Sequence, residues 1–363
     1  MPDETWTVGR ILSWIEGYLG ERGDATPRVS AQWLVSEALE VSRMQLYLDL
    51  ERPLTAEERA VLRDWTRRRA AGEPLQYITG EVGFRHITLK VGKGVLIPRP
   101  ETEVLVSEAL ALLPPAAKPQ DALDEQIIAE YVALTQEASN DGSAAVNEGS
   151  VQKLRSLHST LAGSSGALPL AAEGTEHIAD APYDVVRSCD AQLLVADICT
   201  GSGCIACSIA HERPDTHVVA TDIAPEAVEL AQRNATALGL DERIDVIGCD
   251  LADGVASELM GTFDLVVSNP PYIPTEDLAA LESQVADYEP RLALDGGVDG
   301  LDVFRRLLDW AKDALKPRGG LAVELHEACL DAAAVEAERA GFVDVRIVRD
   351  LAGKPRILTC RKR

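Results

Sequence analysis

The sequence predicts an α/β fold in which a largely parallel sheet, flanked by helices, follows a small helical bundle. From Leu193 onward, apolar strands alternate regularly with helical segments, a pattern typical of a parallel sheet with helices on both faces. Residues 5–72 instead repeat apolar side chains at three- and four-residue spacing, as amphipathic helices do. The last two apolar runs, 343–348 and 356–360, are joined by Ala352-Gly353-Lys354-Pro355, which indicates an antiparallel hairpin at a sheet edge.

The composition indicates a globular protein with reduced cysteines. At 363 residues and 46% hydrophobic content, the chain is long enough for one large or two ordinary domains. It has no apolar run of about eighteen residues and an acidic start, Met1-Pro2-Asp3-Glu4, so we expect a cytoplasmic protein without a membrane span. The seven cysteines are odd in number and mostly set among apolar residues, which favours free thiols. Cys204 and Cys207 have the spacing of a metal pair, but no second pair follows, so we expect packing residues and no metal.

The formal net charge of −24 bears on the class of partner. Nucleic-acid-binding proteins neutralise phosphates with basic surfaces, so this charge disfavours direct binding to DNA or RNA. Arg67-Arg68-Arg69 and Arg361-Lys362-Arg363 are local basic clusters. The simplest interpretation is a solvated helix face and a frayed terminus, while a contact of the first cluster with an acidic protein or ribosomal RNA stays open.

Residues 1–73 are predicted to form the helical domain. A first apolar stripe comprises Val8, Ile11, Leu12, Ile15 and Leu19. A second comprises Trp33, Leu34, Ala38 and Leu39. Thr55-Ala56-Glu57-Glu58 is a capping box that begins a third helix, and this helix is expected to end near Gly72.

Residues 74–97 are predicted to be a β-hairpin that links two domains. Apolar and polar side chains alternate over 87–91, as in a strand with one buried face. Prolines then fix the backbone before a helix with Glu101 and Glu103 in its first turn, where the helix dipole favours acids. Arg99, between the prolines, can pair with one of these glutamates.

Residues 98–113 are expected to begin a second domain, which resumes at 192–363 after an insertion at 114–191. The insertion is rich in Ala, Ser, Gly and acidic residues and poor in aromatics. Such a composition buries too little apolar surface to fold compactly, so we expect a flexible acidic segment.

A glycine turn after the first sheet strand predicts a site for an adenosine ligand. Residues 195–204 read Val-Ala-Asp-Ile-Cys-Thr-Gly-Ser-Gly-Cys, and glycines let backbone amides approach a ligand closely. A dinucleotide fingerprint would need a third glycine where Ala206 stands, and no phosphate-loop lysine follows. We therefore expect a ligand smaller than a dinucleotide. The candidate binding residues of this turn are Asp197, Cys199, Thr200, Gly201, Ser202 and Gly203.

The next two strands each deliver an aspartate. Asp222 follows the strand at 218–220, where a carboxylate can accept hydrogen bonds from both ribose hydroxyls. Asp250 follows the strand at 244–247 and is placed to meet an adenine edge. An aspartate of this kind alone is more often a helix cap or a solvated loop residue, but the place of these two at successive strand ends predicts a shared ligand site.

The apolar strand 263–267 ends in Asn269-Pro270-Pro271-Tyr272, which predicts a site for an NH2 group. The prolines remove backbone donors, so the carbonyls of Asn269 and Pro270 are left outside a regular ladder. A substrate nitrogen would donate one hydrogen to the Asn269 side-chain oxygen and one to the Pro270 carbonyl, while Tyr272 and Pro271 pack on the amide plane. Asn269, Pro270 and Tyr272 are the candidate catalytic residues, and Asn269 also borders the expected cofactor. A strand that simply ends in a proline turn is the plain alternative.

Three stretches, LIPRPETEVLV at 96–106, DICTGSGCIA at 197–206 and VVSNPPYIP at 266–274, resemble the HemK/PrmC family. These are N5-glutamine methyltransferases that modify the Gly-Gly-Gln loop of peptide-chain release factors. The resemblance covers most of the chain outside the insertion, and 97–103 is its most specific part, because Asn-Pro-Pro-Tyr also occurs in methyltransferases that act on adenine or on other protein amides.

The resemblance implies a class I S-adenosylmethionine-dependent methyltransferase, with a Rossmann-like seven-stranded sheet behind a helical substrate-recognition domain. S-adenosylmethionine is then the expected cofactor and a release factor the expected partner, with Arg99 beside the substrate.

Two positions depart from the family pattern. Cys199 replaces the first glycine of the turn, which is tolerable at negative φ and would weaken cofactor binding at positive φ. Leu251 stands where some members carry an aromatic side chain against adenine, so we expect altered cofactor affinity.

Three alternatives stay open. The first is a methyltransferase for a ribosomal-protein glutamine or an adenine base. The second is a non-catalytic S-adenosylmethionine-binding module with the insertion as an interaction arm. The third, a dehydrogenase, is disfavoured by Ala206 and by the hairpin ending.

Overall fold

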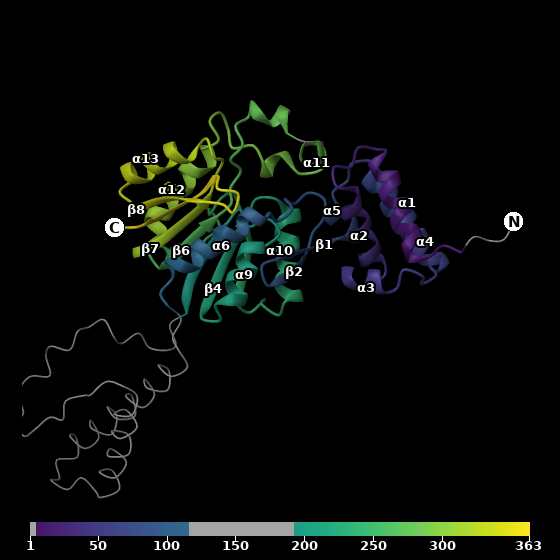
Figure 1. The fold of residues 1–363 in the computed structure, drawn as a ribbon. Coiled ribbons are helices and arrows are strands. Elements are labelled where there is room, and N and C mark those ends of the chain that lie inside the picture. The colour runs from purple at the N-terminus through teal and green to yellow at the C-terminus, as the bar shows by residue number, and fades with distance from the viewer. Residues whose placement is uncertain (1–4, 116–191, 282) are drawn as a thin grey trace, which may run out of the picture. The chain divides into compact units, whose positions relative to one another are not determined.

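The structure is a computed structural model that describes residues 5–115, 192–281 and 283–363 (Figure 1). All but the first two residues of the predicted insertion at 114–191, together with its expected flexibility, lie outside the described residues. Among the helices that are described, none has the length and apolar character needed to cross a membrane.

The front of the chain is helical, as predicted. Its elements are α1 (Val8–Gly20), α2 (Pro27–Ala38), α3 (Arg43–Leu48), α4 (Ala56–Ala70) and α5 (Leu75–Thr79). The capping box is confirmed, because Thr55 Oγ1 accepts from Glu58 N at 3.1 Å and Glu58 Oε2 accepts from Thr55 N at 2.8 Å. Helices α3 and α5 were not predicted, since six and five residues are too few to show a helical period.

The arginine cluster of α4 is used inside this helical region. Arg68 pairs with Glu73 at 2.7 Å, and Arg69 pairs with Asp24 at 2.7 Å with side chains only 7% and 4% exposed. Burial opposes ionisation of Asp24, but the hydrogen bond from Arg69 outweighs it together with smaller contributions and holds the pKa of Asp24 below its usual value. The prediction of a solvated basic face is therefore wrong for Arg69.

A hairpin lies within the predicted stretch 74–97, although helix α5 occupies its first residues. Strands β1 (Glu81–Phe84) and β2 (Ile87–Lys90) pair antiparallel, with Val82 opposite Leu89. Their alternate apolar side chains are buried, as a two-residue period requires. Helix α6 (Pro100–Leu112) follows with a proline in its first turn and Arg99 as its N-cap residue.

A seven-stranded sheet forms the second part, with strand order β5-β4-β3-β6-β7-β9-β8. Its strands are β3 (Leu193–Ile198), β4 (Thr216–Asp222), β5 (Ile244–Gly248), β6 (Phe263–Ser268), β7 (Leu315–Glu324), β8 (Val343–Arg349) and β9 (Pro355–Arg361). Strands β3 to β7 run parallel, whereas β9 pairs antiparallel with both β7 and β8. This confirms the predicted fold class, including the antiparallel hairpin at one edge.

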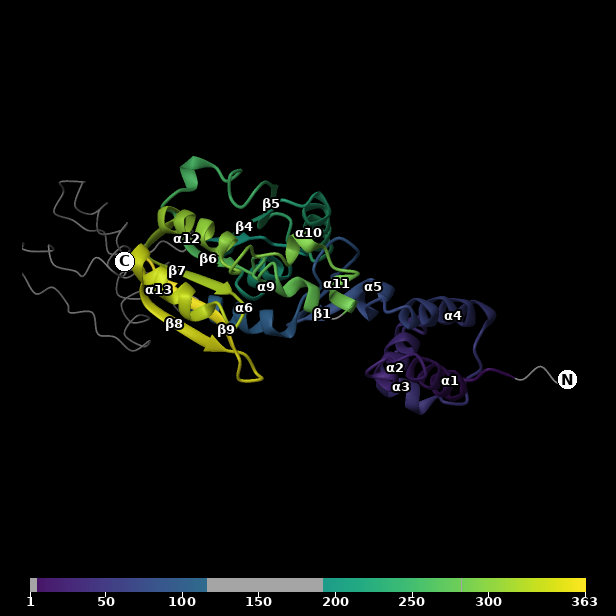
Figure 2. The ribbon, with the colours of Figure 1, turned by 90° about the horizontal axis from the view of Figure 1, so that it is seen from above.

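Helices cover both faces of the sheet (Figures 1 and 2). Packed on one face are α6, α9 (Cys204–Glu212) and α10 (Pro225–Ala237), and on the other α12 (Asp302–Ala314) and α13 (Leu330–Ala340). Successive residues of β3 point into different cores, with Val195 in the first and Ala196 in the second, so the strands are apolar throughout. Shorter elements are α11 (Ser283–Ala286), η1 (Ser257–Leu259), η2 (Asp277–Ala280) and η3 (Arg291–Ala293).

Candidate active site

A cavity of about 310 Å³ lies at the carboxyl ends of the parallel strands. This is the position at which open α/β sheets bind ligands, and the volume is within the range of small-molecule sites. The predicted residues that line the cavity are Arg99, Cys199, Thr200, Gly201, Ser202, Asp222, Asp250, Asn269 and Pro271. The predicted residues Asp197, Gly203, Pro270 and Tyr272 are not among its lining.

The two glycines of the turn after β3 have different structural roles. Gly201 has φ of +57°, and a side-chain carbon there would meet only Val95, at 3.9 Å, so the loop presents open backbone toward the cavity. Gly203 has φ of +79°, and a side-chain carbon there would lie 3.1 Å from Ala231 Cβ of α10. Gly203 is thus required for close packing of the turn on α10, whereas Gly201 leaves room for a ligand.

Asp197 lies beneath this turn and is fully buried. Its Oδ2 accepts from Thr200 Oγ1 at 2.6 Å and from Ala206 N at 3.0 Å, which ties the turn to the start of α9. Burial raises the pKa of Asp197 to about 7. The sequence motif placed Asp197 among the ligand contacts, whereas its observed contacts shape the turn from below.

The two strand-end aspartates differ in their surroundings. Asp222 accepts hydrogen bonds from Gly201 N and from Ala224 N, both at 2.9 Å, which fixes its carboxylate at the cavity wall. Burial raises the pKa of Asp222. Asp250 is half-exposed and pairs with Arg306 Nη2 at 2.9 Å. An adenine at Asp250 would therefore meet a carboxylate that is already neutralised by an arginine.

Two residues that line or border the cavity have strained backbones. Cys199 has φ of +62° and Leu251 has φ of +49°, the left-handed region in which side chains other than glycine are disfavoured. The condition under which Cys199 was expected to weaken cofactor binding is therefore met. Both strained residues stand where the sequence departs from the family pattern, at the two ends of the expected adenosine site.

Replacing Cys199 with glycine is expected to stabilise the fold, because a left-handed residue with a side chain costs roughly 1 kcal/mol that glycine avoids. The free energy of unfolding, from urea denaturation, measures the change. Cys199→Ala is the matched control, since it removes the thiol but keeps the strained Cβ, so the glycine variant should be the more stable of the two by roughly 1 kcal/mol. Equal stability of the two variants would show that the turn is not strained at this residue.

A buried hydrogen-bonded chain leads from β7 to Asn269. Asn269 Nδ2 donates to Thr102 Oγ1 at 3.2 Å, and Thr102 Oγ1 donates to Glu324 Oε2 at 2.8 Å. The Tyr272 hydroxyl donates to Glu324 Oε1 at 3.2 Å. Thr102 and Glu324 are 2% and 1% exposed. The Asn-Pro-Pro-Tyr turn is thereby fastened at two points to one buried carboxylate.

Sequence reasoning missed both Thr102 and Glu324. Thr102 lies within the stretch 97–103, between two glutamates, and was not predicted as a site residue. Glu324 ends β7, next to β6 in the sheet. The rule that singled out Asp222 and Asp250, a polar side chain at the carboxyl end of a parallel strand, applies equally to Glu324 and would have found it.

Arg99 does not pair with Glu101 or Glu103. Its Nη2 donates to Glu289 Oε1 at 2.5 Å, and Glu289 is 6% exposed, with no hydrogen-bond partner for Oε2 among the described residues. Arg99 therefore does form an ion pair with a glutamate, but the predicted partner was wrong. Glu289 lies 190 positions further along the sequence, and no local pattern links it to Arg99. Burial raises the pKa of Glu289, and Arg99 opposes the rise.

The loop after η3 packs directly on the Asn-Pro-Pro-Tyr turn. A side-chain carbon on Gly296 would lie 2.7 Å from Tyr272 Cα, and one on Gly300 would lie 2.5 Å from Tyr272 O. Ile273 N donates to Leu294 O, and Gly296 N donates to Ile273 O. The backbone that presents Tyr272 is therefore held by a second backbone at the closest distance that glycine permits.

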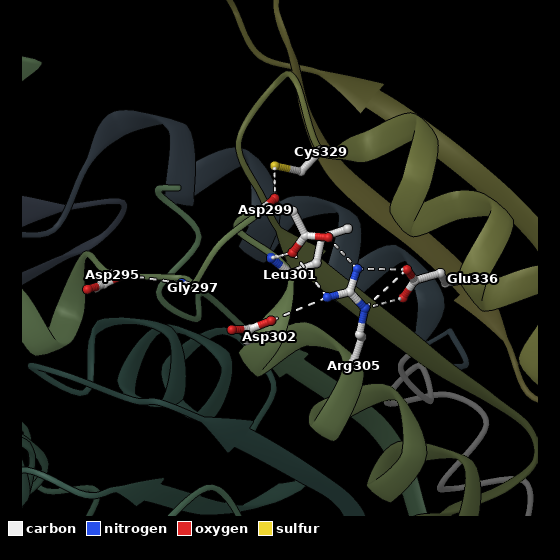
Figure 3. Close-up of polar contacts among 8 residues, drawn as sticks. All are labelled: Asp295, Gly297, Asp299, Leu301, Asp302, Arg305, Cys329 and Glu336. Atoms are coloured by element: carbon white, nitrogen blue, oxygen red, sulfur yellow. Dashed lines mark hydrogen bonds and ion pairs between the residues drawn. The ribbon is translucent and has the colours of Figure 1, made fainter. Parts of the chain in front are cut away.

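Arg305 of α12 holds the far side of this loop (Figure 3). Its guanidinium contacts Asp299 at 2.5 Å, Asp302 at 3.3 Å and Glu336 of α13 at 3.0 Å. The Cys329 thiol donates to the Asp299 carbonyl at 3.2 Å. The loop is thus fixed between the Tyr272 backbone and the two helices behind it.

Cys204 and Cys207 are buried in the core on α9. Within the residues that the structure describes, no group of three or more His, Cys, Asp or Glu side chains is arranged to hold a metal ion.

Comparisons with known proteins agree with this architecture. Residues 10–80 match the family description "PrmC N-terminal domain", and residues 185–298 match "Methyltransferase small domain". The chain is 34% identical to a release factor glutamine methyltransferase of Geobacter sulfurreducens, over 98% of this chain and 96% of that protein. It is 33% identical to one of Chlorobaculum tepidum, over 99% of each. A solved methyltransferase from Pyrococcus furiosus aligns at 23% identity with a TM-score of 0.35, over 47% of this chain and 75% of that one, a similarity too low to support an inference.

S-adenosylmethionine is the methyl donor, and the residues around the cavity fit it. Ser202 lines the cavity, and its Oγ is buried without a hydrogen-bond partner in the described part of the chain, so a ligand with polar groups would supply one. The match to the relatives extends over nearly the full length of each chain, including the helical region in front of the sheet. This chain belongs to the release factor glutamine methyltransferase family.

Proposed function

We propose that this protein methylates the side-chain amide nitrogen of the glutamine in the Gly-Gly-Gln motif of peptide-chain release factors. The observation that carries the proposal is the orientation of Asn269. Its nitrogen is engaged by Thr102, which turns its side-chain oxygen away from Thr102 at a cavity wall shared with the glycine turn. An amide oxygen in that position is suited to accept a hydrogen from a substrate NH2 group.

The proposed roles of the residues follow from the chemistry of an amide. Its nitrogen is a weak nucleophile because its lone pair is delocalised, so the site must orient the nitrogen and favour a pyramidal NH2. Asn269 Oδ1 and the Pro270 carbonyl would accept its two hydrogens, and Pro271 and Tyr272 would pack on the amide plane. S-adenosylmethionine supplies the electrophilic sulfonium methyl.

The bond changes balance without a general base. Bound S-adenosylmethionine would supply the methyl carbon and its sulfur would keep the electron pair of the bond that breaks, so the amide nitrogen would need neither an oxidant nor a base to receive the methyl group. The methylated nitrogen then loses one proton to water. The residues of the chain contribute by positioning and by excluding water, which supplies much of the rate.

The cofactor contacts are proposed at Cys199, Thr200, Gly201, Ser202, Asp222 and Asp250, with Asp197 and Gly203 shaping the turn. Arg99, held by Glu289, would contact the backbone of the release factor beside the glutamine. The helical region at 1–73 is proposed to recognise the release factor, and translation would locate the enzyme in the cytoplasm. The net charge of −24 supports a protein substrate over a nucleic acid.

The test is transfer of labelled methyl from S-adenosylmethionine to a purified release factor, beside a release factor whose Gly-Gly-Gln glutamine is replaced. DNA and ribosomal proteins are offered in parallel. We expect label on the intact release factor alone. Label on another acceptor would show that the substrate is that molecule and not a release factor. Cofactor binding without any methyl transfer would favour a non-catalytic binding module.

A further inference from the structure

We propose that Thr102 and Glu324 are positioning residues that set which end of the Asn269 amide faces the substrate, and that protonation of Glu324 reverses this orientation. The inference rests on the proposed function, since it concerns the residue that would accept a hydrogen from the substrate glutamine.

The orientation follows from counting donors. An ionised glutamate has only acceptors, and the Thr102 hydroxyl has a single hydrogen. At 2.8 Å that hydrogen is donated to Glu324 Oε2, so Thr102 Oγ1 can serve Asn269 only as an acceptor. Asn269 must therefore turn its NH2 group toward Thr102, at 3.2 Å, and its oxygen away. An asparagine alone has no such preference, because its two ends are nearly equal in size.

A proton on Glu324 Oε2 reverses the direction of the two hydrogen bonds that join Glu324, Thr102 and Asn269. A carboxylic acid whose Oε2 carries the proton donates to Thr102 Oγ1, and the threonine hydrogen is then available to Asn269. The amide accepts it best with its oxygen toward Thr102, which turns the NH2 group toward the substrate NH2. Two donors then face each other, and the substrate nitrogen loses its acceptor.

The groups around Glu324 place this change in an accessible pH range. Burial, and to a smaller extent the charge of Glu101, raise the pKa of Glu324, while the hydrogen bonds from Thr102 and Tyr272 and the charge of Arg356 oppose the rise, so that the pKa is about 7. Cys204 also lies close enough for its own pKa to be raised slightly by Glu324. The ionised form is present above pH 7 and is lost below it, so the productive orientation is expected at the higher pH.

The first measurement is independent of the acceptor. The chain has four asparagines, at 140, 147, 234 and 269, so protein labelled with 15N-asparagine gives a simple spectrum of side-chain amides. The Asn269 resonances, assigned with Asn269→Ala, are expected to titrate near pH 7 in the wild-type chain and to stay constant in Glu324→Gln. Burial also raises the pKa of Asp197 to about 7, but a spectral change caused by Asp197 would persist in Glu324→Gln. Titration of the Asn269 resonances near pH 7 in Glu324→Gln would overturn the proposal.

The second measurement is kcat at saturating S-adenosylmethionine and release factor, followed across pH. Wild-type kcat should fall about tenfold per pH unit below pH 7, and the fall should vanish in Glu324→Gln. Tyr272→Phe removes a donor to the carboxylate and should move the midpoint upward. Thr102→Val, of similar shape but without the hydroxyl, should lower kcat about 10- to 100-fold with unchanged S-adenosylmethionine affinity, and Thr102→Ser should restore most of it.

The outcomes distinguish the proposed methyl transfer from the proposed role of Thr102 and Glu324. Absence of transfer by the wild-type chain would refute the proposed function and leave the resonance titration to decide the inference. Wild-type transfer combined with normal kcat in Thr102→Val would refute the inference alone. Cofactor affinity and thermal unfolding of each variant show that a lost activity does not come from lost folding.

Discussion

Asn269→Ala is expected to reduce methyl transfer at least about 100-fold, the scale on which a single preorganised hydrogen-bond partner acts in a transition state. The alanine leaves one hydrogen of the substrate NH2 group without its acceptor and removes the contact that fixes the group beside the methyl donor. Asn269 also lines the cofactor cavity, yet the turn at 199–202 supplies more of its wall. Binding of S-adenosylmethionine should therefore weaken far less than turnover.

Single-turnover transfer to a release factor, with cofactor affinity from calorimetry, separates the two effects. The release factor with its glutamine replaced is the control for label on other sites. Near-wild-type turnover in Asn269→Ala would remove the asparagine from the proposed chemistry, and an equal loss of turnover and affinity would make it a cofactor contact only.

Much of the fold was predictable because it depends on periodic patterns. The strands of the parallel sheet are buried on both faces and appear as short apolar runs, so β3 to β6 were recognised from residues such as Val195 and Phe263. The meeting of Gly201, Asp222 and Asn269 at one cavity also followed from sequence, since parallel strands bring their carboxyl ends to one edge.

The contacts between distant segments could not be predicted in the same way. Thr102 meets Asn269 across 167 positions, and no local pattern in α6 shows which strand end its first turn will reach. The buried pair of Asp24 and Arg69 has the same origin, because an arginine in a basic triplet looks like a surface residue until the helices pack.

The sign of φ at Cys199 could not be predicted from the sequence either. A cysteine in place of a family glycine is consistent with either a relaxed or a left-handed turn, and only the path of the chain after β3 decides between them. Backbone strain of this kind at a ligand site is an outcome of tertiary structure. The residue type identified Cys199 as a departure from the family pattern but could not predict the sign of its φ.

Gly300→Ala is expected to lower methyl transfer by about 100-fold or more, because a displacement of about 1 Å in a reacting group is enough for such a loss. The added carbon would lie 2.5 Å from Tyr272 O and 3.0 Å from Cys329 Sγ, at a φ of +76°. The backbone carbonyl cannot give way as a flexible side chain would, and Arg305 holds the loop from behind through Asp299 and Asp302. The strain must therefore move the segment that carries Tyr272.

The matched control is Gly239→Ala, at a φ of +67° with no atom within 4 Å of the added carbon. It carries the cost of a left-handed alanine, roughly 1 to 2 kcal/mol of unfolding free energy, without the clash. Gly300→Ala should lose that amount plus roughly 1 to 3 kcal/mol for overpacking, measured by urea denaturation. Stability alone would lower activity equally in both variants once corrected for the folded fraction, so a kcat loss confined to Gly300→Ala would locate the effect in the Tyr272 backbone. Equal kcat per folded molecule in the two variants would show instead that the loop 295–302 stabilises the fold without aligning the site.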